Sequence, residues 1–132
     1  MATLPVYELS NLDGVRVSSP QAEGALVCFI KEDCPTCQEV MPVLDAFFAQ
    51  YGEHMPVQVI GQTQEGNSAL AAAFSPSFSI LDDSALRVSF AADIETVPTL
   101  LHTDANGNEL TRLVGFVKDE WQTMASELDA LT

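Results

Sequence analysis

The sequence has few basic residues, few cysteines and no long apolar run. Five lysines and arginines stand against nineteen aspartates and glutamates, which gives a formal net charge of −14. A surface this negative repels phosphate backbones and anionic lipids, so we expect neither nucleic acid nor membrane as a partner. The longest apolar run, residues 25–30, is far shorter than the roughly 20 residues of a membrane-spanning helix. Three cysteines are too few, and odd in number, for a disulfide scaffold.

The first ten residues also lack the basic start and the apolar stretch of a signal peptide. We therefore expect a cytoplasmic protein if Met1 is the native start, and an extracytoplasmic one if a signal segment has been removed. The 132 residues, 47% of them hydrophobic, suffice for one domain with a packed core. We see no internal repeat and predict a single domain over residues 1–132.

The order of predicted strands and helices indicates an α/β fold. Residues 25–31 form an apolar run without glycine or proline, typical of a strand buried on both faces. Helices are predicted after Cys37, where Val40, Val43, Leu44, Phe47 and Tyr51 share one face, and at the C-terminus, from Val117 to Leu131. Further strands and helices are predicted at 6–19 (a hairpin), 57–60, 65–74 (helix), 78–81, 84–92 (helix), 99–103 and 110–115. This order predicts a mixed sheet with helices on both faces.

The sequence Cys34-Pro35-Thr36-Cys37 carries the clearest chemical signal. It follows the predicted buried strand and opens a helix, where unpaired N–H groups and the helix dipole stabilise a thiolate. Residues three apart lie on one helix face, close enough for a disulfide. Cys34 is therefore the candidate nucleophile and Cys37 the candidate resolving thiol. The alternative, half of a zinc site, lacks paired ligands, because only Cys28, His54 and His102 remain.

These motifs resemble those of TlpA-like thiol–disulfide oxidoreductases, which have the thioredoxin fold. Pro42 stands where that family has a helix-kinking proline, and Val97-Pro98-Thr99 is similar to its cis-proline motif. Val114-Gly115-Phe116 before an amphipathic helix resembles the family's C-terminal end. Residues 7–14 resemble the hairpin that these proteins place before the core. The resemblance covers the whole chain and implies an N-terminal hairpin extension, residues 1–23, on a thioredoxin core, residues 24–132.

The resemblance also implies a reaction and its partners. Cys34 would attack a protein disulfide, and Cys37 would release the product from the mixed disulfide. The redox-active Cys34–Cys37 pair would need no other cofactor and no metal, only a protein disulfide substrate and a thiol electron donor. The chain would act as a monomer. An extended substrate peptide would bind in a groove formed by Pro35, Thr36, Thr96, Val97, Pro98, Gly115 and Phe116.

Three positions depart from the family pattern. Cys28 stands where thioredoxins have a buried aspartate, Val40 where TlpA-like proteins often have a glutamate, and Asp33 where an aromatic residue is usual. The usual buried proton acceptor for Cys37 is thus missing; Glu39 and Glu95 are the possible substitutes. Because Glu32 and Asp33 oppose a further negative charge at Cys34, we expect a reductant rather than an oxidant.

Two other functions on the same fold are weaker alternatives. A peroxiredoxin-like peroxidase requires threonine three residues before its reactive cysteine, where this chain has Lys31. The other alternative is a non-enzymatic metal-delivery or scaffold module. A copper-carrying protein of this kind would favour wider cysteine spacing and a nearby histidine, and this sequence shows neither.

Five remaining residues are expected to have structural roles or none. We expect Cys28 to be an inert buried side chain and Trp121 to lie in the core. His102 is expected at the surface, and Asp82-Asp83 as solvated loop charges.

Overall fold

A mixed five-stranded sheet forms the centre of the computed structural model, which describes residues 3–132. Its strand order is β5 (Ile80–Asp82), β4 (Val57–Gly61), β3 (Ala25–Phe29), β6 (Thr99–Thr103) and β7 (Glu109–Val114). The β3, β4 and β5 strands run parallel, whereas β6 is antiparallel to both of its neighbours. A separate hairpin, β1 (Glu8–Ser10) and β2 (Arg16–Ser18), precedes the sheet, as predicted.

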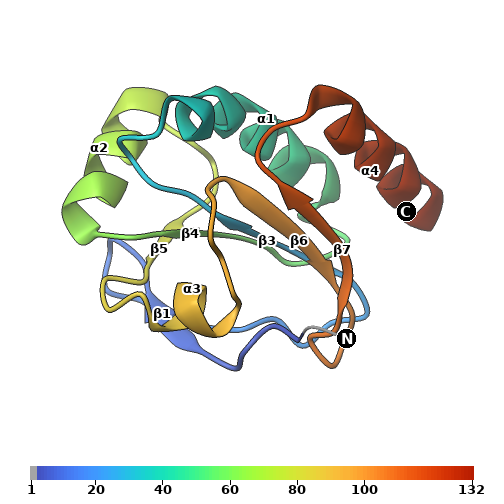
Figure 1. Cartoon of the computed structure of the whole chain (residues 1–132), viewed down its shortest axis with the longest axis horizontal. Coiled ribbons are helices and arrows are strands. Elements are labelled where there is room, and N and C mark those ends of the chain that lie inside the picture. The colour runs from blue at the N-terminus through green and yellow to red at the C-terminus, as the bar shows by residue number, and fades with distance from the viewer. Residues whose placement is uncertain (1–2) are drawn as a thin grey trace.

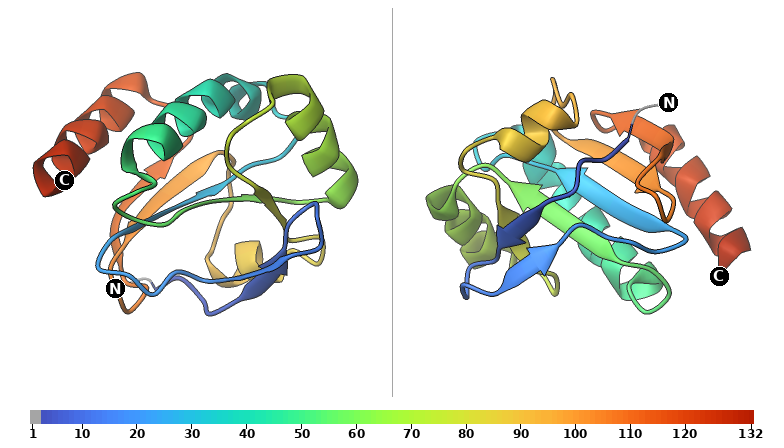
Figure 2. Two further views of the ribbon diagram at one scale, coloured as in Figure 1. Left: turned by 180° about the vertical axis from the view of Figure 1, so that it is seen from behind. Right: turned by 90° about the horizontal axis from the view of Figure 1, so that it is seen from below.

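Helices cover both faces of the sheet, which confirms the predicted α/β architecture (Figure 1). On one face lie α1 (Pro35–Tyr51), α2 (Gln64–Phe74) and α4 (Lys118–Leu131). The short α3 (Arg87–Ala91) and the β1–β2 hairpin lie on the opposite face, as the two views of Figure 2 show. We call these the helical face and the hairpin face.

Strand β3 is the centre of the core because it is buried from both sides. Leu26 and Cys28 pack into the cluster under α1 and α4, and Val27 and Phe29 into the cluster under the hairpin and α3. None of the four is more than 1% exposed. Because successive side chains of a strand point to opposite faces of the sheet, β3 contributes to two separate hydrophobic cores. The uninterrupted apolar run of the sequence reflects this double burial.

Two expectations about polar residues were wrong. His102 was expected at the surface but is only 6% exposed, because β6 lies between β3 and β7 with both faces covered. Asp83 was expected to be solvated but is 2% exposed. Its carboxylate accepts hydrogen bonds from the N–H groups of Val88 and Ser89 and from the Ser89 hydroxyl, and so holds the first turn of α3.

Candidate active site

The two cysteines lie where the carboxyl end of β3 meets the first turn of α1. Cys34 is the N-cap residue of α1, and its sulfur accepts a hydrogen bond from the Cys37 N–H at 3.2 Å. Pro35 follows at the start of the helix. A backbone N–H at this position makes no hydrogen bond within a helix, so proline is tolerated there. The helix terminus thus directs a backbone donor and its positive dipole end at the Cys34 sulfur.

Cys37 is in a different environment one helical turn later. It is fully buried, and its sulfur accepts the Lys31 N–H at 3.4 Å. Burial raises the pKa of the Cys37 thiol to about 12, and the neighbouring Cys34 and Asp33 contribute to the rise. All three cysteines are free thiols in this structure. The partly exposed Cys34 is therefore the accessible thiol, and Cys37 the protected one.

The segment before β6 forms the opposite wall of the site. The Cys34 sulfur lies 3.6 Å from the carbonyl oxygen of Val97, to which its thiol donates. The Val97–Pro98 peptide bond is cis, as the resemblance implies. The Pro98 carbonyl accepts a 2.7 Å hydrogen bond from the Gly115 N–H. This bond joins the segment before β6 to the end of β7.

Gly115 and Phe116 are positioned by the first turns of α4. Gly115 has a φ of +75°, a conformation that other residues rarely adopt. Its carbonyl accepts the Trp121 indole N–H at 3.3 Å, and Phe116 packs edge-to-face on Trp121 with ring centroids 5.2 Å apart. Phe116 and Val97 both pack against the core cluster that holds Cys37. The structure therefore places Val97 beside Cys34 and joins Pro98, Gly115 and Phe116 to the same wall.

The other three predicted groove residues border this site. Pro35 and Thr36 belong to the first turn of α1, with Pro35 exposed and Thr36 half-buried. Thr96 is exposed, and its carbonyl accepts the Thr99 hydroxyl at 2.6 Å. Their part in binding a substrate stays a prediction.

Of the two acidic residues before Cys34, Asp33 has a basic partner and Glu32 packs against α2. The Lys31 ammonium lies 3.4 Å from the exposed Asp33 carboxylate. The Glu32 carboxylate lies against Gly66 in the first turn of α2, so tightly that a Cβ at Gly66 would clash with it. Glu39 and Glu95, the suggested substitutes for a buried acid, are both exposed. Sequence reasoning missed Lys31, although its place between the buried strand and the cysteines could have indicated it.

Cys28 lies next to this site but has no access to solvent. Burial raises the pKa of its thiol far above the ordinary value, and the charge of Cys37 contributes. Cys28 is therefore the inert core residue that was expected. Within residues 3–132, no three histidine, cysteine, aspartate or glutamate side chains come together as metal ligands. In that same range no helix combines the length and the apolar character needed to cross a bilayer.

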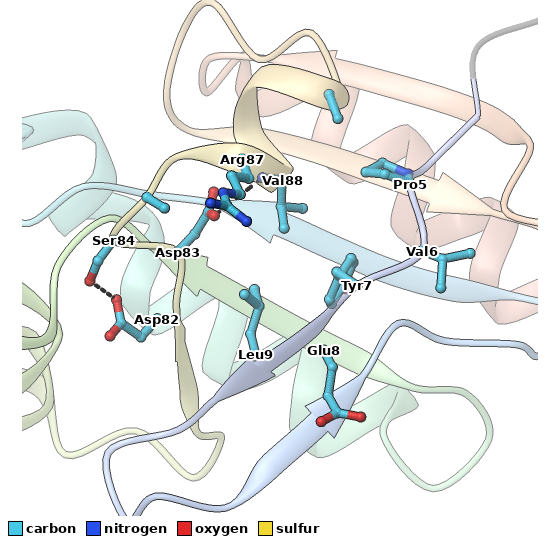
Figure 3. Close-up of a pocket in the computed structure, with 12 residues that line it drawn as sticks. Pro5, Val6, Tyr7, Glu8, Leu9, Asp82, Asp83, Ser84, Arg87 and Val88 are labelled. Carbon is cyan, nitrogen blue, oxygen red and sulfur yellow. Dashed lines mark hydrogen bonds between the residues drawn. The ribbon is translucent and has the colours of Figure 1, made fainter.

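A hollow lies away from the cysteines, on the hairpin face (Figure 3). This hairpin groove, of about 560 Å³, lies between residues 5–9 and residues 82–91. Its lining includes Tyr7, Leu9, Asp82, Ser84, Arg87 and Val88. Neither active-site cysteine lines it. No motif in the sequence indicated the groove, because it forms only when the hairpin packs beside α3.

Comparisons with known proteins establish the fold. Neither the family models nor the curated proteins that were compared match this sequence. Among solved structures, a proposed thiol:disulfide interchange protein DsbE from Chlorobium tepidum superposes with a TM-score of 0.86 at 18% identity, over 98% of this chain and 94% of that one. A thiol-disulfide oxidoreductase from Bacteroides fragilis gives 0.79 at 18% identity, over 96% and 98%.

A secreted disulfide oxidoreductase from Mycobacterium tuberculosis gives a TM-score of 0.74 at 18% identity, over 92% of this chain and 95% of that one. These neighbours are thioredoxin-fold proteins. The predicted thioredoxin fold is thereby confirmed over nearly the whole chain.

Proposed function

We propose that the protein is a thiol–disulfide oxidoreductase that exchanges disulfides with protein substrates through Cys34 and Cys37. The observation that carries the proposal is the asymmetry of the two thiols. Cys34 is partly exposed at a helix N-terminus, whereas Cys37 is buried one turn behind it. An exposed nucleophile with a protected second thiol is the arrangement that disulfide exchange requires. The activities of the solved neighbours support the proposal.

The reaction balances without a cofactor. The Cys34 thiolate attacks a sulfur of the substrate disulfide, forms a mixed disulfide and releases one substrate thiolate. Cys37 then attacks the Cys34 sulfur, loses its proton, forms the Cys34–Cys37 disulfide and releases the second thiolate. The substrate gains two electrons from the protein. A thiol donor later supplies two electrons to the protein and reduces its Cys34–Cys37 disulfide.

Reduction of insulin disulfides with dithiothreitol as electron source tests the activity. We expect the wild-type chain to accelerate it and Cys34→Ser to be inactive. Iodoacetamide should alkylate Cys34 before Cys37 or Cys28 in the reduced protein, because Cys34 alone combines exposure with the helix terminus. Faster labelling of Cys37 would contradict the assignment of roles. Peroxide reduction without disulfide exchange would favour the peroxidase alternative, and stoichiometric metal binding the delivery module.

We propose further that the protein works as a reductant. Burial of Cys37 and the charge of Asp33 both oppose the anionic reduced form, and a dithiol whose reduced form is poorly stabilised is reducing. Equilibration with glutathione mixtures measures this property. We expect the Cys34–Cys37 disulfide to persist in excess reduced glutathione; ready reduction would identify an oxidant.

For the location, we propose an extracytoplasmic compartment, supported by the likeness to a secreted oxidoreductase. Fractionation of cells that express the complete native gene product tests it. Recovery in the cytoplasm would contradict the proposal.

A further inference from the structure

The Cys37 sulfur has two hydrogen-bond partners, a backbone N–H and the Cys34 sulfur. Once Cys34 is in a mixed disulfide, its sulfur can no longer take up the Cys37 proton. The hydrogen-bond donor to the Cys37 sulfur is the Lys31 N–H. Around it lie the apolar side chains of the core cluster, among them Val40 one helical turn away, and the thiol of Cys28. The charged and titratable groups that act on it are Cys34, Cys28 and the largely exposed Asp33, which Lys31 pairs. Of these, Cys34 and Asp33 disfavour a thiolate at Cys37.

This environment bears on the second step of the exchange reaction. Cys37 must lose its proton before it can attack the mixed disulfide, because the thiolate is the nucleophile. In the mixed disulfide Cys34 no longer carries a charge, so its contribution disappears. Burial, the largest cause of the raised pKa, stays. The proton must therefore leave to solvent from a side chain with no exposed surface.

We propose that no side chain among residues 3–132 acts as a base for Cys37, so that the mixed disulfide between Cys34 and its partner is resolved slowly and is long-lived. The inference rests on the proposed function and specifies its kinetics. A persistent covalent intermediate gives a thiol donor from solution time to attack the mixed disulfide in place of Cys37. The second step, rather than the first, then limits turnover.

Reaction of the reduced protein with dithiobis(nitrobenzoate) separates the two steps. Attack by Cys34 releases one coloured nitrothiobenzoate at a rate proportional to reagent concentration. Attack by Cys37 on the aryl mixed disulfide releases a second one at a rate independent of that concentration. We expect the second rate to increase about tenfold per pH unit between about pH 6.5 and 9, following the thiolate fraction. A plateau below pH 8 would overturn the proposal.

Installing a carboxylate provides the matched test. Val40→Glu and Cys28→Asp place an acid in the cluster that surrounds Cys37, and Val40→Gln and Cys28→Asn are their uncharged controls. We expect each carboxylate variant to release the second nitrothiobenzoate at least about tenfold faster at pH 7 than its amide control. Equal rates in folded pairs would contradict the proposal. If the variants do not fold, the wild-type pH profile decides.

The same experiment distinguishes failure of this inference from failure of the proposed function. Two fast, pH-insensitive phases that end in a Cys34–Cys37 disulfide would remove the slow step and leave the exchange activity in place. Release of a single nitrothiobenzoate even at high pH, or of none at Cys34, would contradict the exchange function itself.

Discussion

The dithiol site and the hairpin groove differ in which reactive groups they bring together. The groove has a volume of about 560 Å³, but its buried acid, Asp83, is fully occupied in holding α3. The dithiol site combines a partly exposed thiol, a helix N-terminus and an opposing carbonyl at Val97. Convergent reactive groups rather than volume therefore identify the candidate active site.

The two regions also differ in how they are supported. The dithiol site rests on buried aromatic residues: Trp121 contacts Phe116 and Phe47, and Phe47 packs against Tyr51. On the hairpin face, Val6 in the groove lining and Phe90 on α3 are 86% and 87% exposed. The aromatic packing under the cysteines holds Gly115 and Phe116 in place. The hairpin face has a buried core of its own, but Val6 and Phe90 lie outside it.

The largest effect is expected from removing the nucleophile. Cys34→Ser should abolish disulfide exchange completely, because no other thiol is accessible. Arg87→Ala, which changes the only basic residue lining the hairpin groove, should leave the rate unchanged. Insulin reduction measures both. Loss of exchange in Arg87→Ala would show that the groove takes part in the reaction and that the contrast between the regions is wrong.

Truncating aromatic residues on the two faces should show the difference in support. Trp121→Ala removes a side chain that is 2% exposed and should lower the free energy of unfolding by about 3–5 kcal/mol. Phe90→Ala should change it by less than about 0.5 kcal/mol, since the ring is almost fully solvated. Urea denaturation of both variants measures the effects. Similar losses would mean that Phe90 is packed in solution.

Removing the buried carboxylate should have an intermediate and local effect. Asp83→Ala leaves two N–H groups of α3 without a partner, which should cost about 1–3 kcal/mol of stability. Disulfide exchange should continue at its normal rate, because Asp83 is on the hairpin face. Asp82→Ala is the matched control and should cost less, since Asp82 is more exposed. Hydrogen exchange of the Val88 and Ser89 amides would show whether the loss is confined to α3.

Much of the fold could be predicted because local and tertiary preferences agree. The apolar run at Ala25 predicted a central strand, and the spacing of Val117, Trp121, Met124 and Leu128 predicted α4, three of whose apolar positions are buried. The cysteine motif itself placed Cys34 at the N-cap of α1. These signals depend on residues close together in the sequence.

The features that could not be predicted depend on contacts between distant segments. His102 is polar, and nothing in its neighbours indicates that β7 and the helical face cover it. In the sequence, Asp83 is typical of a loop charge. In the folded protein, α3 brings the amides of Val88 and Ser89 to its carboxylate. The contact between Glu32 and Gly66 joins the segment after β3 to the first turn of α2, and α1 and β4 lie between them in the sequence.

The smallest expected effect belongs to His102, beneath the helical face. Its Nε2 atom has no hydrogen-bond partner among residues 3–132. Burial lowers the pKa of its imidazole from the ordinary 6.5, with Glu127 partly opposing the shift. The folded protein thus binds fewer protons here than the unfolded chain, so this contribution to stability is complete above about pH 6.5 and is lost as the pH falls. Urea denaturation measures the free energy of unfolding at each pH. Between pH 7.5 and 5.5, this free energy should fall by about 1 kcal/mol more in the wild type than in His102→Gln. Glu127→Gln should enlarge that loss. If the free energy of unfolding falls equally in the wild type and in His102→Gln, the imidazole is not the cause of the loss.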